Sequence, residues 1–487
     1  MRLYRKIAVV ALMTVLFVSC DDFGSTNVDP NNPSEVRTEL LLTNAQRDVS
    51  DVVGAFMGTL WVQYIAETQY TEDQEYRNTN ADFNGWYTGP LQDLQTIIDL
   101  NTNEETRGDV LSGGSNENQI AVARILKAYY MQMITDRWGM IPYSEALQGR
   151  DNLQPSYDSQ SAIYEDIITE LKEAAEQINT GSAAVNGDIL FSGDMERWIR
   201  FANSLRARAA LRLSESDAGL AEAEFADAIN DGIIQEDVMY PYLSDADNEN
   251  PWYTRFRTRT DYAIHETIAS YMKDLEDPRV LVYANPAPNY SDGNDVITFD
   301  EIRGMPFLEN AGELENAEIS FPGAAIGAGG PSVGQQSAPL PIITLAELHF
   351  SMAEAVERGW ISGSAEDHYY SGIEASWNQW GVYDEAAYAD FIAQADVAYS
   401  SAEWDEKIGN QKWVALFPLG YEAWSEWRRL EYPQLAPNPF AAASFPEIPL
   451  RFTYPSSEVS NNTENYNAAV DAQGPDTPYT QVWWDAN

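Results

Sequence analysis

The sequence predicts a mostly α-helical protein in which pairs of helices form a body and long loops lie between some of them. Apolar side chains recur at three- and four-residue intervals along many stretches, which is typical of helices with one buried face. Several of these stretches are separated by only a few residues, as in helical repeats. The 487-residue chain has one cysteine, so no internal disulfide can form and a packed core must stabilise the fold.

The first element is a signal-like segment. A short basic start precedes an apolar run over residues 7–18, which is shorter than the roughly 20 residues that span a bilayer and typical of a secretory signal. The run ends at Cys20, and the stretch resembles a bacterial lipoprotein signal. The acidic pair Asp21-Asp22 that follows resembles the surface-export signal of Bacteroidetes lipoproteins. This resemblance implies a signal peptide over 1–19, lipidation of Cys20 and a flexible polar tether over 20–35. An ordinary cleaved signal with an incidental cysteine is the alternative.

Five helices are predicted in the first half of the chain. The clearest covers 119–138, where Val122, Leu126 and Tyr129 recur on one face. Within the first helix, Gly54 and Gly58 are expected to allow close approach of a neighbouring element. The five predicted ranges are 40–66, 90–101, 119–138, 159–178 and 194–214.

The second half begins with loops and then returns to helices. Residues 232–340 are rich in Pro, Gly, Asn and Tyr, with one helix expected near 262–275. Further helices are expected at 345–359, 370–380, 384–397 and 402–430. We expect one domain over 36–487, with a helical body (about 36–231 and 341–430), the loop-rich region and a tail (431–487) that wraps over the body.

Five segments in order resemble the SusD/RagB family of outer-membrane nutrient-binding lipoproteins, particularly its SusD-like branch. They are 136–146 (DRWGMIPYSEA), 198–208 (WIRFANSLRAR), 277–279 (DPR), 346–355 (AELHFSMAEA) and 428–433 (RRLEYP). The resemblance implies tetratricopeptide-like helix pairs that form a scaffold, with long loops facing the ligand. It also implies a lipid-anchored outer-membrane protein facing the cell exterior, partnered with a SusC-like TonB-dependent transporter and delivering oligosaccharides to it.

The loop after the first predicted helix is one candidate for ligand contact. Sugars present apolar ring faces and a rim of hydroxyls, so a binder needs flat aromatic rings together with carboxylate or guanidinium hydrogen bonds. The loop carries both, in Asp73, Tyr76, Arg77, Trp86 and Tyr87. Packing of these aromatic side chains against the body is the alternative.

A second candidate stretch lies in the loop-rich region. Trp252, Tyr253 and Arg255 combine two aromatic rings with a guanidinium within four residues, which suits stacking on a sugar equally well. A packing role is again the alternative. The paired C-terminal residues Trp483 and Trp484 offer a further platform, although a docked terminus is the favoured interpretation.

The four arginines of the 194–214 helix (Arg200, Arg206, Arg208 and Arg212) do not share one face. This spacing favours ion pairing with acidic neighbours over capture of an anion, and the pair Arg428-Arg429 is interpreted in the same way. The formal net charge of −47 argues against nucleic acid as a partner, because nucleic-acid binding relies on clustered Lys and Arg.

Catalytic and metal-binding signatures are scarce. The three histidines (His265, His349 and His368) have no metal-ligand spacing, and His349 is expected to pack within a helix. The oxygen-rich turn at 292–295 leaves calcium a weak possibility, because the full twelve-residue loop pattern is missing. We therefore predict no catalytic residues, no resident metal and no required cofactor.

The resulting hypothesis is a non-enzymatic, glycan-binding surface lipoprotein. Three alternatives stay open: a peptide-binding lid of the same kind of transporter, a surface glycoside hydrolase, and a purely structural subunit. The 76 acidic residues make a hydrolytic carboxylate pair impossible to dismiss from sequence, since any two at a suitable separation serve.

Overall fold

The computed structural model describes residues 36–294, 296–310, 312–328 and 335–486. Helices dominate this part of the chain, so the predicted fold class is confirmed. Cys20, the signal segment and the tether lie outside the described residues. The helices of the first half are α2 (Thr38–Arg47), α3 (Val49–Val53), α4 (Met57–Trp61), α5 (Asn84–Trp86), α6 (Gln92–Thr102), α7 (Asn116–Trp138), α8 (Gln160–Gln177), α9 (Met195–Arg212), α10 (Ala218–Asp231) and α11 (Pro251–Phe256).

The helices of the second half begin beyond a short strand at 262–264. They are α12 (Glu266–Asp274), α13 (Val280–Tyr283), α14 (Leu345–Glu357), α15 (Ala365–Gln379), α16 (Glu385–Ile392), α17 (Trp404–Ala415), α18 (Gly420–Leu430), α19 (Ser456–Asn461) and α20 (Thr463–Gln473).

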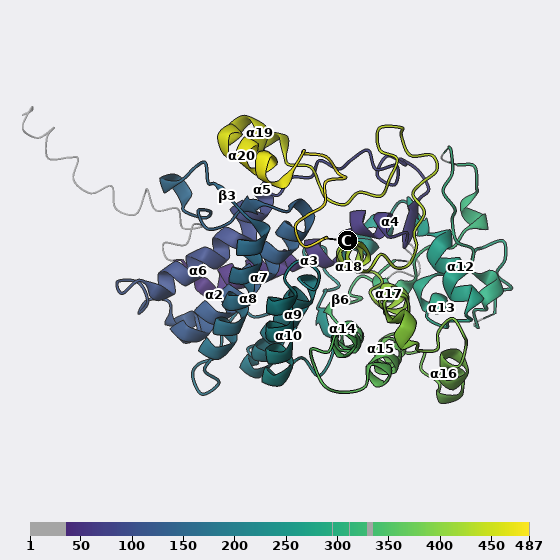
Figure 1. Ribbon diagram of the computed structural model, residues 1–487, viewed down its shortest axis with the longest axis horizontal. Helices are drawn as coiled ribbons and strands as arrows, with labels where there is room; N and C mark the ends of the chain where they lie inside the picture. The colour runs from purple at the N-terminus through teal and green to yellow at the C-terminus, as the bar shows by residue number, and fades with distance from the viewer. Residues whose placement is uncertain (1–35, 295, 311, 329–334, 487) are drawn as a thin grey trace, which may run out of the picture.

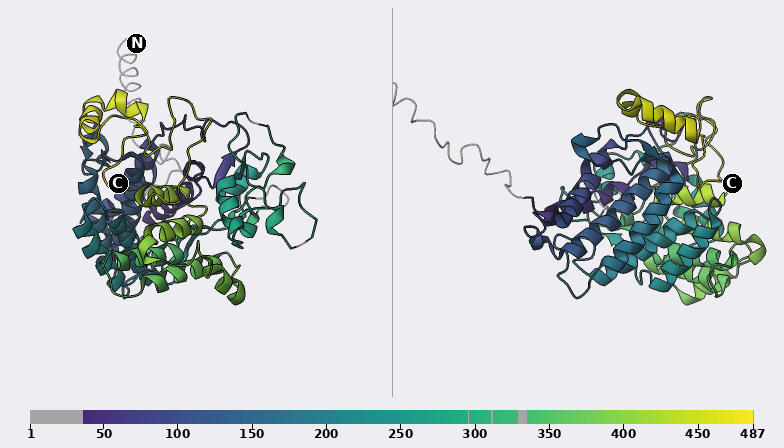
Figure 2. Two further views of the ribbon diagram at one scale, coloured as in Figure 1. Left: turned by 45° about the vertical axis from the view of Figure 1, so that its right-hand side comes forward. Right: turned by 60° about the vertical axis from the view of Figure 1, so that its left-hand side comes forward.

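Consecutive helices pack side by side as hairpins. Helix α7 packs on α8, α8 on α9 and α9 on α10, and the pairs α14–α15 and α17–α18 repeat the arrangement further along the chain. Figure 1 and Figure 2 show the purple-to-teal helices of the first half beside the green helices of the second half, with the loop-rich region at one side. The helix pairing predicted from short connections is therefore confirmed.

In the described part of the chain there are three two-stranded antiparallel sheets. Their strands are β1 (Ile65–Glu67) with β5 (Tyr262–Ile264), β2 (Ile141–Pro142) with β3 (Tyr157–Asp158), and β4 (Val238–Tyr240) with β6 (Leu340–Ile343). Two of the sheets, β1–β5 and β4–β6, join segments that are far apart in sequence. The first of these sheets ties the end of the N-terminal helices to the loop-rich region.

The predicted helix over 40–66 is wrong as a single element. The chain forms α2, α3 and α4 with breaks at Asp48 and around Gly54, and then enters β1. The expected close approach at the glycines is confirmed: a Cβ on Gly54 would lie 2.2 Å from Cγ of Pro251, and one on Gly58 would lie 2.5 Å from the backbone of Gly420. Glycine is therefore required at 54 for the approach of α11 to the end of α3, and at 58 for close packing of α4 on α18.

Two other helix predictions need correction. The expected helix over 402–430 is divided into α17 and α18, because Pro418 cannot donate a backbone hydrogen bond in a continuous helix. The helix expected near 262–275 begins only at Glu266, because residues 262–264 pair with β1 instead. Helix α10 was not predicted, and it buries only a narrow stripe of Ala221, Phe225 and Ala228.

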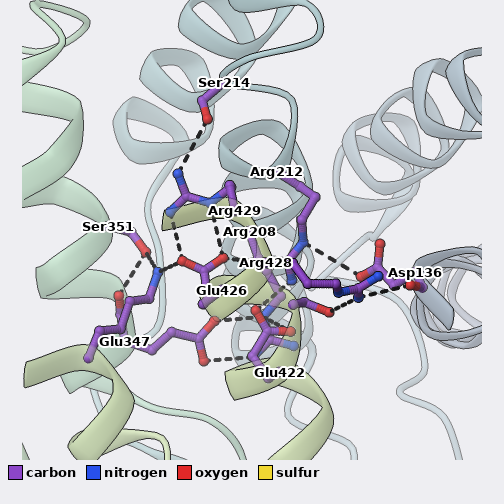
Figure 3. Close-up of polar contacts among 12 residues, drawn as sticks. Asp136, Arg208, Arg212, Ser214, Glu347, Ser351, Glu422, Glu426, Arg428 and Arg429 are labelled. Carbon is purple, nitrogen blue, oxygen red and sulfur yellow. Dashed lines mark hydrogen bonds and ion pairs between the residues drawn. The ribbon is translucent and has the colours of Figure 1, made fainter. Parts of the chain in front are cut away.

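A cluster of ion pairs lies inside the helical body, between α9, α14, α17 and α18 (Figure 3). Arg208 donates to Glu347 at 2.6 Å. Arg429 donates to Glu354 at 2.6 Å. Arg212 pairs with Glu422 at 2.6 Å, and it also contacts Glu426. The predicted structural use of these arginines is confirmed. Arg206 also forms ion pairs, with Glu224, Asp227 and Asp231. Arg428 has a structural role of another kind, because it donates to backbone carbonyls. Arg200 instead lines a surface cavity.

The C-terminal segment crosses the body and ends docked on it. Phe452 N donates to Arg137 O at 2.8 Å, and Thr453 N donates to Thr79 O at 2.9 Å. Helices α19 and α20, yellow in Figure 1, lie over the N-terminal helices near β3. Trp484 is fully buried, so the docked terminus is the arrangement that forms.

Candidate ligand-binding surface

The β1–β5 pair brings the two predicted candidate stretches together. Glu67 lies opposite Tyr262, and the pairing continues into the loops through Thr68, whose backbone N donates to Asp261 O at 2.8 Å. The Thr68 hydroxyl donates to Thr260 O at 2.7 Å. The loop that follows β1 and the segment that precedes β5 are therefore held against each other.

Tyr70 and Arg259 form the exposed part of this junction. Tyr70 is 62% exposed, and Cζ of Arg259 lies 4.9 Å from the centroid of its ring. Arg259 is also exposed and pairs with Asp261 at 2.6 Å. A second such pair lies close by in sequence, with Arg257 5.7 Å from the ring of Tyr253. We call Tyr70, Tyr253, Arg257 and Arg259 the aromatic strip.

Neither Tyr70 nor the two arginines of the strip belong to the predicted candidates. Tyr70 lies in the same predicted loop as Asp73 and Arg77, and its sequence neighbours do not show which of the loop's aromatic rings is exposed. Arg259 is brought to Tyr70 by the pairing of β1 with β5, whereas Arg257 contacts Tyr253 four residues before it in the chain. Three-residue strands carry too weak a sequence pattern to predict that pairing.

Asp73 and Arg77 lie in the loop beside the strip. Asp73 is half-buried and accepts a hydrogen bond from Asn78 Nδ2 at 2.6 Å, while burial raises the pKa of its carboxyl. Arg77 is exposed and pairs with Glu75 at 2.7 Å. Both side chains remain placed where they could hydrogen-bond a ligand, so their ligand contact stays a prediction.

Tyr76 does not fit the predicted stacking role. Its ring is 1% exposed, and its hydroxyl accepts a hydrogen bond from Asn438 N at 2.9 Å. The left-handed backbone at Tyr76 (φ 62°) turns the side chain under the loop. Tyr76 therefore supports the loop from below and docks the C-terminal segment.

Trp86 and Tyr87 pack along α7, next to strand β2. The ring of Trp86 is half-buried, 5.6 Å from that of Tyr130, and the Tyr87 hydroxyl donates to Pro142 O at 2.5 Å. Tyr87 is also in edge contact with Phe83. The packing alternative describes most of both side chains, and ligand contact by the exposed part of Trp86 stays a prediction.

Trp252 is a core residue, contrary to the predicted ligand contact. Its side chain is 0% exposed, because Asn250 caps α11 and turns the second residue of that helix inward. Arg255 lies over it, 4.8 Å from the ring centroid, and donates to Gly54 O at 2.8 Å. Of the predicted stretch, only Tyr253 offers a partly open ring.

A buried carboxyl underlies the loop that carries Tyr70. Glu67 is almost fully buried, and Gln74 holds it through reciprocal hydrogen bonds: Gln74 N donates to Glu67 Oε2 at 3.0 Å and Glu67 N donates to Gln74 Oε1 at 2.8 Å. Burial raises the pKa of Glu67 to about 8, with Asp73 and Glu72 adding to the shift. The carboxyl is therefore largely protonated at neutral pH.

Within the described ranges, no group of three or more His, Cys, Asp or Glu side chains is arranged to hold a metal ion. The oxygen-rich turn at 292–295 ends at Asp295, which lies outside the described residues. His349 is half-buried on α14, with its ring 5.8 Å from that of His368.

A cavity of about 830 Å³ lies between α6, α7 and α8 and differs chemically from the strip. Carboxylates and two basic side chains dominate its wall, and Tyr143 is its one aromatic ring among the described residues. The charged lining residues are Asp99, Arg124, Lys127, Asp151, Asp158, Asp166 and Glu170. The aromatic strip, which exposes one tyrosine ring and part of a second, is therefore the better match to the apolar faces of a sugar.

Comparison with known proteins agrees with the fold. A family model described as SusD-like, starch-binding and associating with the outer membrane, matches residues 30–455. A SusD homologue from Bacteroides fragilis has 25% identity and a TM-score of 0.78, over 93% of this chain and 99% of that one. A chitin-binding SusD homologue from Flavobacterium johnsoniae has 25% identity and a TM-score of 0.73, over 92% and 98%.

A protein described as chitin-binding matches with 25% identity and a TM-score of 0.76, over 93% of this chain and all of that one. No curated protein matches the sequence. In the part of the chain that the structure describes, no helix combines the length and the apolar character needed to cross a membrane.

Proposed function

The chain belongs to the SusD-like family, and we propose that it is a surface glycan-binding lipoprotein that captures oligosaccharides without cleaving them. It then passes them to a SusC-like TonB-dependent transporter in the outer membrane. The observation that carries the proposal is the aromatic strip, in which exposed Tyr70 stands beside Arg259 on a junction fixed by β1 and β5.

The strip has the two kinds of group that a sugar requires. An exposed tyrosine ring can stack on the apolar face of a hexose, and a guanidinium presents several donors to the hydroxyl rim. The arginines are paired with Asp261 and Glu249, so their orientation is set before a ligand arrives. Preorganisation of this kind lowers the entropy lost on binding.

Attachment to the membrane is assigned to Cys20. Several acyl chains on one residue give stable anchoring, since each buried methylene contributes about 0.8 kcal/mol. The polar segment up to residue 35 then acts as a tether for the folded domain. A tethered domain can move over a transporter while it stays at the outer surface.

The proposal is tested by affinity electrophoresis of the purified protein through gels that contain starch, chitin derivatives and other polysaccharides. We expect retardation by at least one glycan and no release of reducing ends from it. Release of reducing ends that is lost on substitution of a single carboxylate would identify a hydrolase. Capture of peptides with no glycan retardation would identify the peptide-binding lid, and retention of neither would leave a structural subunit.

A further inference from the structure

A small groove lies beside the docked C-terminus, on α8 and α20. Its volume is about 290 Å³, and Trp483 forms one wall. Trp483 is 38% exposed, while its neighbours Val482 and Trp484 are buried. The other lining residues are Met140, Ser159, Gln160, Ser161, Ala472, Gln473 and Gln481.

The backbone that presents Trp483 is fixed on both sides. Trp484 N donates to Gln160 Oε1 at 3.4 Å, and Asp485 N closes a turn onto Val482 O at 3.0 Å. The ring of Trp484 lies under two guanidinium groups, 4.5 Å from Arg428 and 5.3 Å from Arg212. An exposed aromatic ring held on an anchored segment loses little conformational entropy when it contacts a ligand.

The opposite walls of the groove are also held in place. Gln473 Oε1 accepts from Met140 N at 2.6 Å, and its Nε2 donates to Trp138 O at 3.1 Å. Gln160 Nε2 donates to Thr135 O at 2.8 Å. These bonds tie the groove to the end of α7, so its shape is part of the folded body.

The chemistry of the groove is uncharged. The chain carries a formal charge of −47, yet among the residues that the structure describes no acidic or basic side chain lines this cavity. The hydroxyls of Ser159 and Ser161 lie 3.1 Å apart at the rim, and a hydroxyl can both donate and accept. By contrast, the cavity between α6, α7 and α8 is walled by carboxylates.

We propose that this groove is a second glycan contact, which takes one neutral hexose unit against the ring of Trp483. A tryptophan ring beside hydroxyls and amides matches the apolar face and hydroxyl rim of a sugar. The lack of charge in the wall avoids the cost of desolvating an ion on binding. The inference rests on the proposed glycan-binding function, but it concerns a different surface from the aromatic strip.

The test uses isothermal titration of the full-length protein with maltoheptaose and with chitin hexasaccharide. If the titration of the native protein resolves two binding events, Trp483→Ala is expected to lack one of them. If the two events are not resolved, Trp483→Ala is expected to weaken the single apparent affinity about tenfold. Tyr70→Ala should leave the Trp483 event in place. Tyr383→Ala, which removes an aromatic ring with 39% exposure from the turn between α15 and α16, is the matched control and should change nothing.

Ser161→Glu provides a second variant that leaves the terminus intact. A larger side chain placed in the groove should weaken the same event, because it fills space beside the ring of Trp483 and removes one of the two rim hydroxyls. If the native protein, Trp483→Ala and Ser161→Glu all bind a probe with the same affinity, this inference is wrong and the proposed function is unaffected. Native protein that binds neither probe would contradict the proposed function for starch-type and chitin-type glycans, and this inference with it.

Discussion

The guanidinium of Arg259 lies over the ring of Tyr70, with 4.9 Å between Cζ and the ring centroid. The two residues belong to segments that only the β1–β5 pairing brings together. An exposed cation–π contact contributes about 0.5–1 kcal/mol, which is enough to bias the orientation of the ring while leaving most of it open. This junction is where the fold displays an aromatic surface beside hydrogen-bond donors.

Trp252→Ala should destabilise the protein by about 3–5 kcal/mol, because removal of a buried indole leaves a cavity in the core. Urea unfolding measures the change in the free energy of unfolding. Tyr253→Ala, at the half-buried neighbour, should cost much less and serves as the control. Equal small losses in the two variants would mean that Trp252 is not packed as the structure places it.

Arg429→Met should cost about 3–5 kcal/mol of stability, because Glu354 and Glu426 would then remain buried with fewer partners. Replacing Glu354 by Gln in the same chain should recover part of the loss. Arg197→Gln, which breaks an exposed pair with Glu236, should change stability by less than about 1 kcal/mol. A loss from Arg429→Met no larger than that of Arg197→Gln would contradict the buried arrangement.

Glu67 should make stability fall as pH rises. The unfolded chain releases this proton near its ordinary pKa of 4.5, whereas the folded protein keeps it until the raised pKa of about 8. Stability from this group is therefore complete below pH 4.5 and is lost as pH rises through 8, by up to about 1.4 kcal/mol per pH unit. Urea unfolding at pH 5 and pH 8 compares the native protein with Glu67→Gln.

The Gln variant keeps an acceptor for Gln74 N and cannot ionise, so it should lose less stability than the native protein over that interval. Depressed carboxyls such as Glu426 change both proteins alike and cancel in the comparison. An identical loss in the two proteins would show that Glu67 is already ionised at pH 5.

Cys20→Ala should release the protein from the membrane fraction and abolish labelling by a radioactive fatty acid. Membrane attachment depends on acyl chains at this residue in the proposed anchor, and no other cysteine is present to replace it. Cell fractionation with the native protein as reference measures the distribution. Membrane association that persists together with lipid labelling would rule out Cys20 as the anchor.

Much of the helical body could be predicted, because one buried face leaves a periodic pattern in the sequence. The stripe of Val122, Leu126 and Tyr129 predicted α7 almost to its ends, although the helix is buried on every side from Ala128 to Trp138 and not on one face alone. The close approach at Gly58 was also foreseen, since a missing side chain on a helix indicates a nearby neighbour. Helix α10 was not predicted, because its buried stripe has only one large apolar side chain, Phe225, between two alanines.

The surface was harder to predict than the body. Composition singled out the loop that carries Tyr70, but it could not separate buried Tyr76 from exposed Tyr70, because both occur among the same polar neighbours. Trp252 was misplaced for a related reason: its inward direction is set by the cap at Asn250 and by the contact with Arg255. Which aromatic side chains face solvent is decided by tertiary contacts that a local pattern does not contain.

The most direct test of the central claim is isothermal titration of the native protein and Tyr70→Ala with the glycan that retards the native protein in affinity gels. The account predicts at least about tenfold weaker binding at the strip for Tyr70→Ala, with an unchanged melting temperature, because the exposed ring adds little to the core. Binding by Tyr70→Ala equal to that of the native protein would contradict the assignment of the aromatic strip as the glycan-binding surface.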